Sequence, residues 1–87
     1  MQFLVTYKIS PGTRDVAQQR FKSTGGPPPA GVTMVGRWHC VDGSGGAVVA
    51  ETNDATALAR WIQEWTDVIT FDVRPVLNDE QMAGVIG

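Results

Sequence analysis

The chain has 87 residues, a formal net charge of −2 and an apolar fraction of 43%, which is typical of one small globular domain and argues against disorder. Its 7 lysines and arginines are dispersed, so the basic stripe that binds nucleic-acid phosphates is missing. No apolar run reaches the ~18 residues that a membrane helix needs. We therefore predict one domain over residues 1–87 that binds neither nucleic acid nor membrane.

The cysteine content and the N-terminus predict a cytoplasmic location. The single cysteine, Cys40, cannot form a disulfide within the chain, which fits a reducing compartment. The first residues lead directly into a strand-like segment, without a charged n-region or a small-residue cleavage site, so no signal peptide is expected. A chain this short buries only a modest core, and a second subunit covering one face would add stability.

The first half of the chain predicts a strand and a helix. Residues 2–9 alternate between apolar and polar side chains, which is the period of two of a β-strand. A helix follows to about residue 23, with Ser10 or Thr13 as its N-cap. Gly25 provides a left-handed stop, and the prolines that follow prevent the helix from continuing.

The centre of the chain predicts a β-hairpin. Residues 32–41 and 47–52 are strand-like, and the glycine-rich run 42–46 lies between them. Its Asp-Gly and Gly-Gly pairs tolerate the positive φ of a tight turn. The run lacks the Lys-Ser/Thr ending of a phosphate-binding loop, so a turn explains it better than a phosphate site.

Strict alternation along the first hairpin strand sends neighbouring side chains to opposite faces. It places Trp38 on one face and Arg37 and His39 on the other. The pairing register is left open by the sequence. In one register Glu51 lies across from Arg37 and beside His39, and a slip of one residue moves it to the Trp38 face.

The last part of the chain predicts a helix, a strand and a short helix. Asn53 or Asp54 caps the helix, which runs to about residue 65. Residues 68–77 predict the fourth strand. Asn78 with Gln81 three residues later resembles a capping box, which opens the final helix. The helical period i, i+3, i+4, i+7 is strongest at four positions, which are Leu58, Trp61, Ile62 and Trp65.

The order β-α-β-β-α-β, followed by a short helix, predicts an α+β ferredoxin-like fold with two helices on one face of a four-stranded antiparallel sheet. Gly36 on the helix-side face is expected to leave room for Trp61. The helix-side face is predicted to carry Phe3, Val5, Tyr7, Met34, Trp38, Phe71 and Val73. The opposite face is predicted to carry Leu4, Thr6, Val35, Arg37, His39, Val41, Asp72, Arg74 and Val76.

The mixed character of that opposite face predicts a homodimer. Its aliphatic side chains are too many to leave in water, so a second sheet is expected to pack on it. Two sheets facing each other make a dimeric α+β barrel. In this arrangement Arg37 is expected to pair with Asp72 or Glu51.

Several short motifs together span nearly the whole chain, and they are GGPPP-x-GV, GRWH-x-x-DGSGG, ET-x-D, W-x-x-x-W and PVL-x-DE. As a set they resemble a family of uncharacterised bacterial and phage proteins that is placed in the dimeric α+β barrel superfamily. The resemblance implies the fold and a homodimer, and it implies no reaction. The wider superfamily includes cofactor-independent monooxygenases, lactone isomerases and haem-using enzymes, so the fold alone selects none of them.

Two hypotheses for function involve a pocket, and a third involves none. The first is a homodimer that binds a small ligand between sheet and helix. The second is a cofactor-independent enzyme with His39 as general base, and the third is a structural or regulatory dimer. The pocket is predicted to have aromatic walls and polar anchors, which are Tyr7, Trp38, Trp61 and Trp65 together with Arg37, His39 and Glu51.

No metal site and no cofactor are expected. His39 and Cys40 are neighbours on a strand, so they point to opposite faces and cannot bind one metal ion together. Cys40 is predicted to be a small buried apolar residue, because no base is fixed near its thiol.

Overall fold

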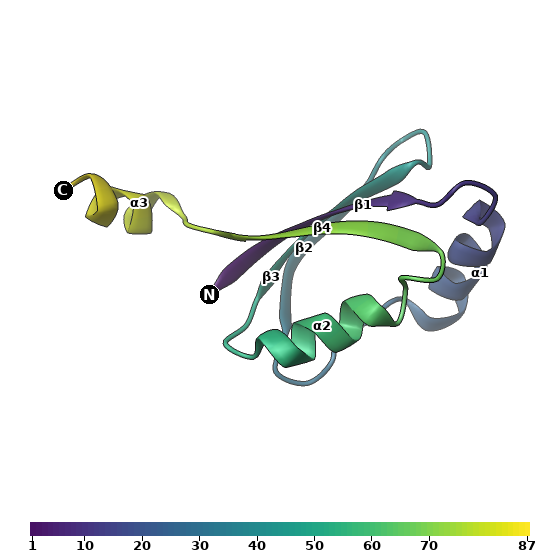
Figure 1. Cartoon of the computed structure of the whole chain (residues 1–87), viewed down its shortest axis with the longest axis horizontal. Coiled ribbons are helices and arrows are strands. Elements are labelled where there is room, and N and C mark those ends of the chain that lie inside the picture. Colours follow the sequence, from purple (N-terminus) through teal and green to yellow (C-terminus); the bar gives the residue numbers. More distant parts are fainter.

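The computed structural model describes all 87 residues and contains a four-stranded antiparallel sheet and three helices (Figure 1). The strand order is β2-β3-β1-β4, so each of the two β-α-β units skips over one strand of the sheet. This confirms the predicted ferredoxin-like βαββαβ fold with an added C-terminal helix. The elements are β1 (Gln2–Ile9), α1 (Arg14–Thr24), β2 (Thr33–His39), β3 (Gly45–Glu51), α2 (Ala55–Gln63), β4 (Ile69–Val76) and α3 (Asp79–Ile86).

The ends of α1 are set by Thr13 and Gly25. Thr13 precedes the helix, and its hydroxyl donates to the carbonyls of Ser10 and Val68, so it ties the helix to the start of β4 instead of capping it. Gly25 has φ 73°, and its N–H donates to the carbonyl of Phe21. The predicted glycine stop is confirmed, because this left-handed conformation costs glycine little.

The other two helices begin at side-chain caps. Asp54, one of the two predicted candidates, accepts a hydrogen bond from the N–H of Ala57 and so caps α2. Asn78 and Gln81 form the predicted capping box at α3, each side chain accepting from the other residue's N–H.

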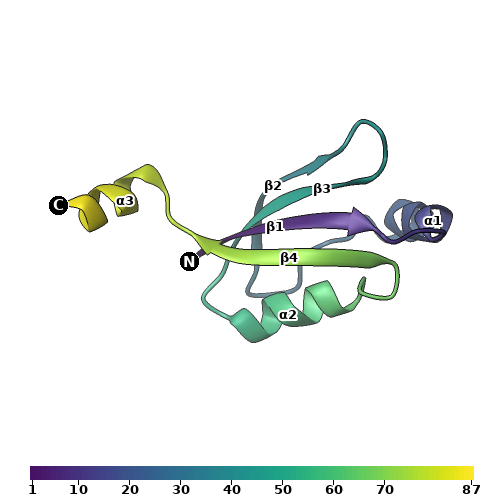
Figure 2. The same cartoon turned by 45° about the horizontal axis from the view of Figure 1, so that its top comes forward.

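The helices α1 and α2 lie on one side of the sheet. Figures 1 and 2 place α2 across this helix-side face, while α1 lies at the end of the sheet where β1 finishes and β4 starts. The main core forms between α2 and the sheet, and a second, smaller core forms around Ala17 on α1. The main core contains Val5, Val32, Val48, Ala50, Ala57, Leu58 and Trp61.

A β-bulge interrupts the pairing of β2 with β3. Met34 pairs with Ala50, and Gly36 pairs with the adjacent residue Val49, so Val35 has no partner on β3. One extra residue in a strand shifts the alternation of every side chain that follows it. The one signal in the sequence was Gly36, because a glycine inside a strand marks either a bulge or a close approach of another group.

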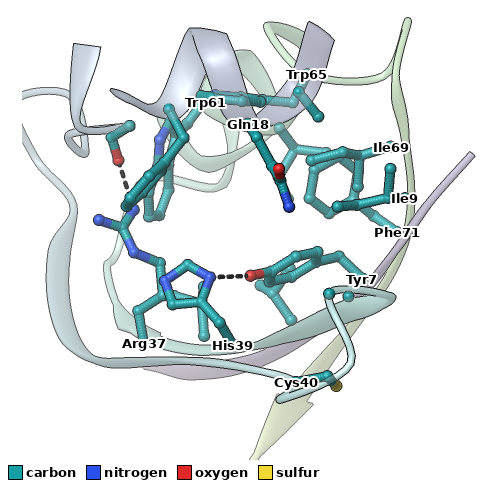
Figure 3. A pocket seen from close by; sticks show the side chains of 18 of the residues that line it. Tyr7, Ile9, Gln18, Arg37, His39, Cys40, Trp61, Trp65, Ile69 and Phe71 are labelled. Carbon is teal, nitrogen blue, oxygen red and sulfur yellow. Dashed lines mark hydrogen bonds between the residues drawn. The ribbon is translucent and has the colours of Figure 1, made fainter. Parts of the chain in front are cut away.

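The bulge reverses the predicted faces of the β2 residues that follow it, while Met34 before it stays on the helix side as predicted, and three expectations are corrected. Arg37 and His39 lie on the helix side, not on the opposite face (Figure 3). Trp38 lies on the face that the helices leave uncovered, which we call the open face, and its side chain is 59% exposed. Gly36 makes room for Trp38 and not for Trp61, because a Cβ at Gly36 would lie 2.3 Å from the Cη2 atom of Trp38.

The C-terminal helix α3 extends away from the rest of the molecule (Figures 1 and 2). It follows the end of β4, and none of its residues is buried. Its large apolar side chains, like those of the connection before it, are exposed to solvent. None of the three helices combines the length and the apolar character that crossing a membrane would require.

Candidate functional site

A cavity of about 440 Å³ lies between the helix-side face of the sheet and the helices α1 and α2 (Figure 3). Of the 19 residues that line it, 13 are hydrophobic. Its volume falls within the range of roughly 300–1,000 Å³ that is usual for small-molecule pockets. The largest apolar groups in its walls are Phe21, Trp61, Ile62, Trp65, Ile69 and Phe71.

The cavity brings together five of the seven residues predicted for a site, which are Tyr7, Arg37, His39, Trp61 and Trp65. The other two lie elsewhere. Trp38 lies on the open face, and Glu51 pairs with Gln2 and Thr33 at the far end of the hairpin. The Glu51 carboxylate there binds the N-terminal ammonium group. Glu51 lies on the same face as Trp38, as the second predicted alternative has it, although it pairs with Thr33 and lies far from both Arg37 and Trp38 along the hairpin.

The polar side of the cavity contains a hydrogen bond between Tyr7 and His39. The Tyr7 hydroxyl lies 2.8 Å from Nδ1 of His39. Tyr7 is on β1 and His39 is the last residue of β2, and both pair with Gly46 on the intervening strand β3. A Cβ at Gly46 would lie 2.5 Å from the Tyr7 hydroxyl oxygen. The bond therefore depends on a glycine between the two partners.

The environment of Tyr7 keeps its hydroxyl protonated at neutral pH. Burial raises the pKa of Tyr7 above its ordinary value, and the positive charge of Arg37 opposes this shift only in part. Which of the two groups donates in this hydrogen bond depends on the tautomer of His39. The Tyr7–His39 pair consequently orients the imidazole, which is still exposed at the cavity edge.

Arg37 stabilises the end of α1 with part of its guanidinium group. Its Nη1 donates to the carbonyl of Gly26 at 2.8 Å, and its Nη2 donates to the carbonyl of Gly25 at 2.9 Å. The guanidinium also lies 4.8 Å from the centroid of the Phe21 ring. Arg37 forms no ion pair, and the predicted partner Asp72 binds Arg74 instead.

The comparison with protein families identifies the chain without assigning an activity. The model of a family described as a domain of unknown function, DUF3303, matches residues 1–87. The chain belongs to the DUF3303 family. No curated protein matches the sequence. The function of this DUF3303 chain must therefore be inferred from its site.

Two tryptophans of this DUF3303 chain lie at the cavity in different environments. Trp61 is part of the main core and is 7% exposed. Trp65 lies just after α2, which ends at Gln63, two residues before the predicted end. The Arg20 guanidinium lies 5.3 Å from the Trp65 ring centroid. Helical spacing correctly placed both rings against the sheet.

Sequence reasoning missed other residues of the cavity. Phe71 and Ile69 lie on the helix-side face of β4, and Phe71 pairs with Tyr7 on β1. The period of two along the predicted fourth strand could have placed both residues on the same face as Tyr7. Phe21 and Gln18 come from α1, where the apolar period is weak. Figure 3 shows the Gln18 side chain pointing into the cavity opposite Tyr7.

The DUF3303 structure also bears on metal binding and on Cys40. It contains no group of three or more His, Cys, Asp or Glu side chains that could hold a metal ion. Cys40 is a free cysteine and is exposed, which corrects the prediction that it is buried. It follows the end of β2 and lies beside the mouth of the cavity.

Proposed function

We propose that this protein binds a small, mostly apolar molecule in the cavity beneath α1 and α2, and that it does so as a homodimer. The observation that carries the first part is the cavity itself, which has apolar walls and a polar side formed by Tyr7, Arg37 and His39. This combination is typical of ligand pockets, in which apolar walls supply affinity and a few polar groups orient the ligand.

A neutral, flat fluorescent probe such as N-phenyl-1-naphthylamine tests the pocket. Binding should raise the emission of the probe and quench tryptophan emission. Trp38→Phe should retain the quenching, because Trp61 and Trp65 remain at the cavity. If quenching disappears with Trp38, the probe binds the open face and the pocket hypothesis is wrong.

Blocking the cavity provides a matched pair of variants. Gln18→Phe places an aromatic ring where the Gln18 side chain enters the cavity and should weaken probe binding at least tenfold. Gln19→Phe makes the same change at the next position of α1, which does not line the cavity, and should leave binding unchanged. Equal affinities of the two variants would contradict the proposal.

The open face supports the homodimer. Only 13 of 87 residues are buried within one chain, and Trp38 and Val35 are 59% and 58% exposed. A symmetric interface places one surface against itself, so a surface with balanced charges avoids repulsion. The charged residues of the open face balance in this way, with Lys8 and Arg74 against Glu51 and Asp72.

Light scattering at micromolar concentration tests the dimer. We expect the mass of two chains for the native protein and of one chain for Trp38→Asp, because the substitution replaces the largest exposed apolar side chain of the open face with a charge that would be buried in the interface. Val16→Asp changes an exposed apolar residue of α1 and should leave the dimer intact. A monomer mass for the native protein would refute the dimer.

A second candidate function is proton transfer by His39, which the Tyr7–His39 hydrogen bond at the cavity favours. The predicted enzyme would exchange an acidic C–H proton of a bound ligand with solvent. NMR in D₂O with a panel of enolisable ketones tests this, with His39→Gln as the inactive variant. Exchange rates that do not depend on His39 would exclude this role.

The remaining hypothesis, a dimer without a pocket, is disfavoured by the size of the cavity.

A further inference from the structure

The charges around the cavity have one sign only. The chain as a whole carries a formal net charge of −2, yet no Asp or Glu is among the 19 residues that line the cavity. Arg37 is the only one of them with a permanent charge, and His39 is the only other side chain there that can become positive. The cavity therefore offers a positive site within mostly apolar walls.

The guanidinium of Arg37 has unused capacity for a ligand. Two of its five N–H donors bind the carbonyls of Gly25 and Gly26, which leaves three donors. No carboxylate neutralises it, since Arg37 is absent from every ion pair of the chain. Its side chain is half-buried, so the charge is only partly hydrated and an added anion would interact with it strongly.

The polar groups of the cavity lie directly beside aromatic rings, since the Phe21 ring centroid is 4.8 Å from the Arg37 guanidinium and 5.2 Å from the His39 ring centroid. Arg37 and His39 are two residues apart on β2 and therefore project to the same side, with Tyr7 beside His39 (Figure 3). Trp65 lies close to the Arg37 guanidinium, because a Cβ at Gly26 would meet both Trp65 Cζ2, at 3.4 Å, and Arg37 Nη1, at 3.1 Å. A ligand that contacts the polar groups and these rings together needs a polar end and a flat apolar body.

We propose that the ligand is a monoanion with a flat apolar body, of which an aromatic carboxylate is the simplest type. The anionic group binds Arg37 with support from the Tyr7–His39 pair, and the body lies against Trp61 and Trp65. This inference rests on the proposed function, because it specifies the chemistry of the molecule in the same cavity. A bidentate contact with a carboxylate suits the planar guanidinium.

Isothermal titration calorimetry with 2-naphthoate and with its neutral analogue 2-naphthamide tests the charge preference. At pH 7 we expect the carboxylate to bind at least tenfold more tightly, and we expect added salt to weaken only the carboxylate. If both bind equally, or if the amide binds better, the ligand is not an anion, although the pocket proposal stands. If neither compound binds and the neutral probe also fails, the proposed function fails as well.

Two substitutions assign the preference to Arg37. Arg37→Gln should reduce naphthoate affinity tenfold or more and leave naphthamide affinity nearly unchanged. Arg60→Gln removes one positive charge from an exposed position of α2 outside the cavity and should affect neither ligand. If Arg37→Gln does not fold, Arg37→Lys keeps the charge and should retain the preference for the carboxylate at reduced affinity. An unchanged preference in Arg37→Gln, or an equal loss in Arg60→Gln, would overturn the proposal.

Discussion

Tyr7 and His39 form their hydrogen bond across an entire strand, over the position of Gly46. Side chains on alternate strands of a sheet are normally separated by a side chain on the strand between them. Here that side chain is missing, and the 2.8 Å bond occupies its place. Gly45, the preceding residue, is equally restricted, because its Cβ would lie 2.0 Å from the Tyr7 carbonyl oxygen.

The first prediction concerns this glycine. Gly46→Ala should break the Tyr7–His39 bond and destabilise the fold by about 1–3 kcal/mol, because the new methyl group overlaps the Tyr7 ring and the Trp38 carbonyl oxygen. Urea unfolding followed by circular dichroism measures the change. Gly84→Ala is the matched control in α3, where a Cβ meets nothing within 4 Å. It should stabilise the protein slightly or leave it unchanged, and equal losses in the two variants would contradict the explanation.

The second prediction isolates the hydrogen bond from the packing. Tyr7→Phe keeps the ring and removes the hydroxyl, so unfolding should become easier by about 0.5–1.5 kcal/mol. A double-mutant cycle with His39→Ala should give a coupling energy of about 0.5–1 kcal/mol, since each change alone removes the same bond. Strictly additive effects of the two substitutions would mean that the bond does not contribute to stability.

The sequence predicted the fold better than it predicted the faces of β2. Alternation, helical period and cap residues depend on local chemistry, and they located all seven elements. The bulge at Val35 depends on how β2 pairs with β3, and the adjacent Gly36 was a local signal that fits either a bulge or a close approach. A single unpaired residue therefore exchanged the places of Trp38 and His39. For that one reason Arg37 and His39 line the cavity, as predicted for the site, whereas Trp38, which was also predicted for it, does not.

The composition of the glycine-rich run 42–46 predicted its turn but did not predict that its last two glycines belong to a strand. Gly43 has φ 75° and belongs to the turn, as the Asp-Gly pair predicts. Gly45 and Gly46 instead belong to β3, where close approach of β1 and of the Tyr7 ring requires glycine. Turn chemistry can be read from neighbours in sequence, whereas a close approach involves a residue about forty positions away.

The third prediction tests a buried hydroxyl that connects two loops. Thr52 is 4% exposed, and its Oγ1 donates to the Gly31 carbonyl at 2.7 Å and accepts from the Asp54 N–H at 2.9 Å. Thr52→Val keeps the shape and leaves both groups without this partner, so the free energy of unfolding should fall by about 1–3 kcal/mol. Thermal and urea unfolding measure it.

Thr66→Val is the control for that substitution. The Thr66 hydroxyl donates to the Gln63 carbonyl, but the residue is exposed, so water can replace the lost bond. We expect a change within about 0.5 kcal/mol. If Thr66→Val lowers the free energy of unfolding as much as Thr52→Val does, burial of the hydroxyl does not determine the size of the loss.

The fourth prediction concerns acid stability and the ion pair between Arg20 and Asp67. Arg20 donates from both terminal nitrogens to the Asp67 carboxylate, at 2.8 and 2.7 Å, and also donates to the Glu64 carbonyl. These hydrogen bonds lower the pKa of Asp67 below its ordinary value. The pair joins α1 to the connection between α2 and β4.

The sign of the pH effect follows from this lowered pKa. Because the folded state favours the ionised carboxylate, the pair stabilises the protein fully above the unfolded pKa of about 4, and this contribution is lost as the pH falls through the folded pKa. Asp67→Asn should therefore lower the Tm at pH 7. On acidification the Tm of this variant should fall by less than the Tm of the native protein does. Asp15→Asn is the control, because Asp15 contacts only its chain neighbour Arg14, and its Tm profile should run parallel to the native one. A native-like acid profile for Asp67→Asn would mean that the Arg20–Asp67 pair is not a source of the pH dependence.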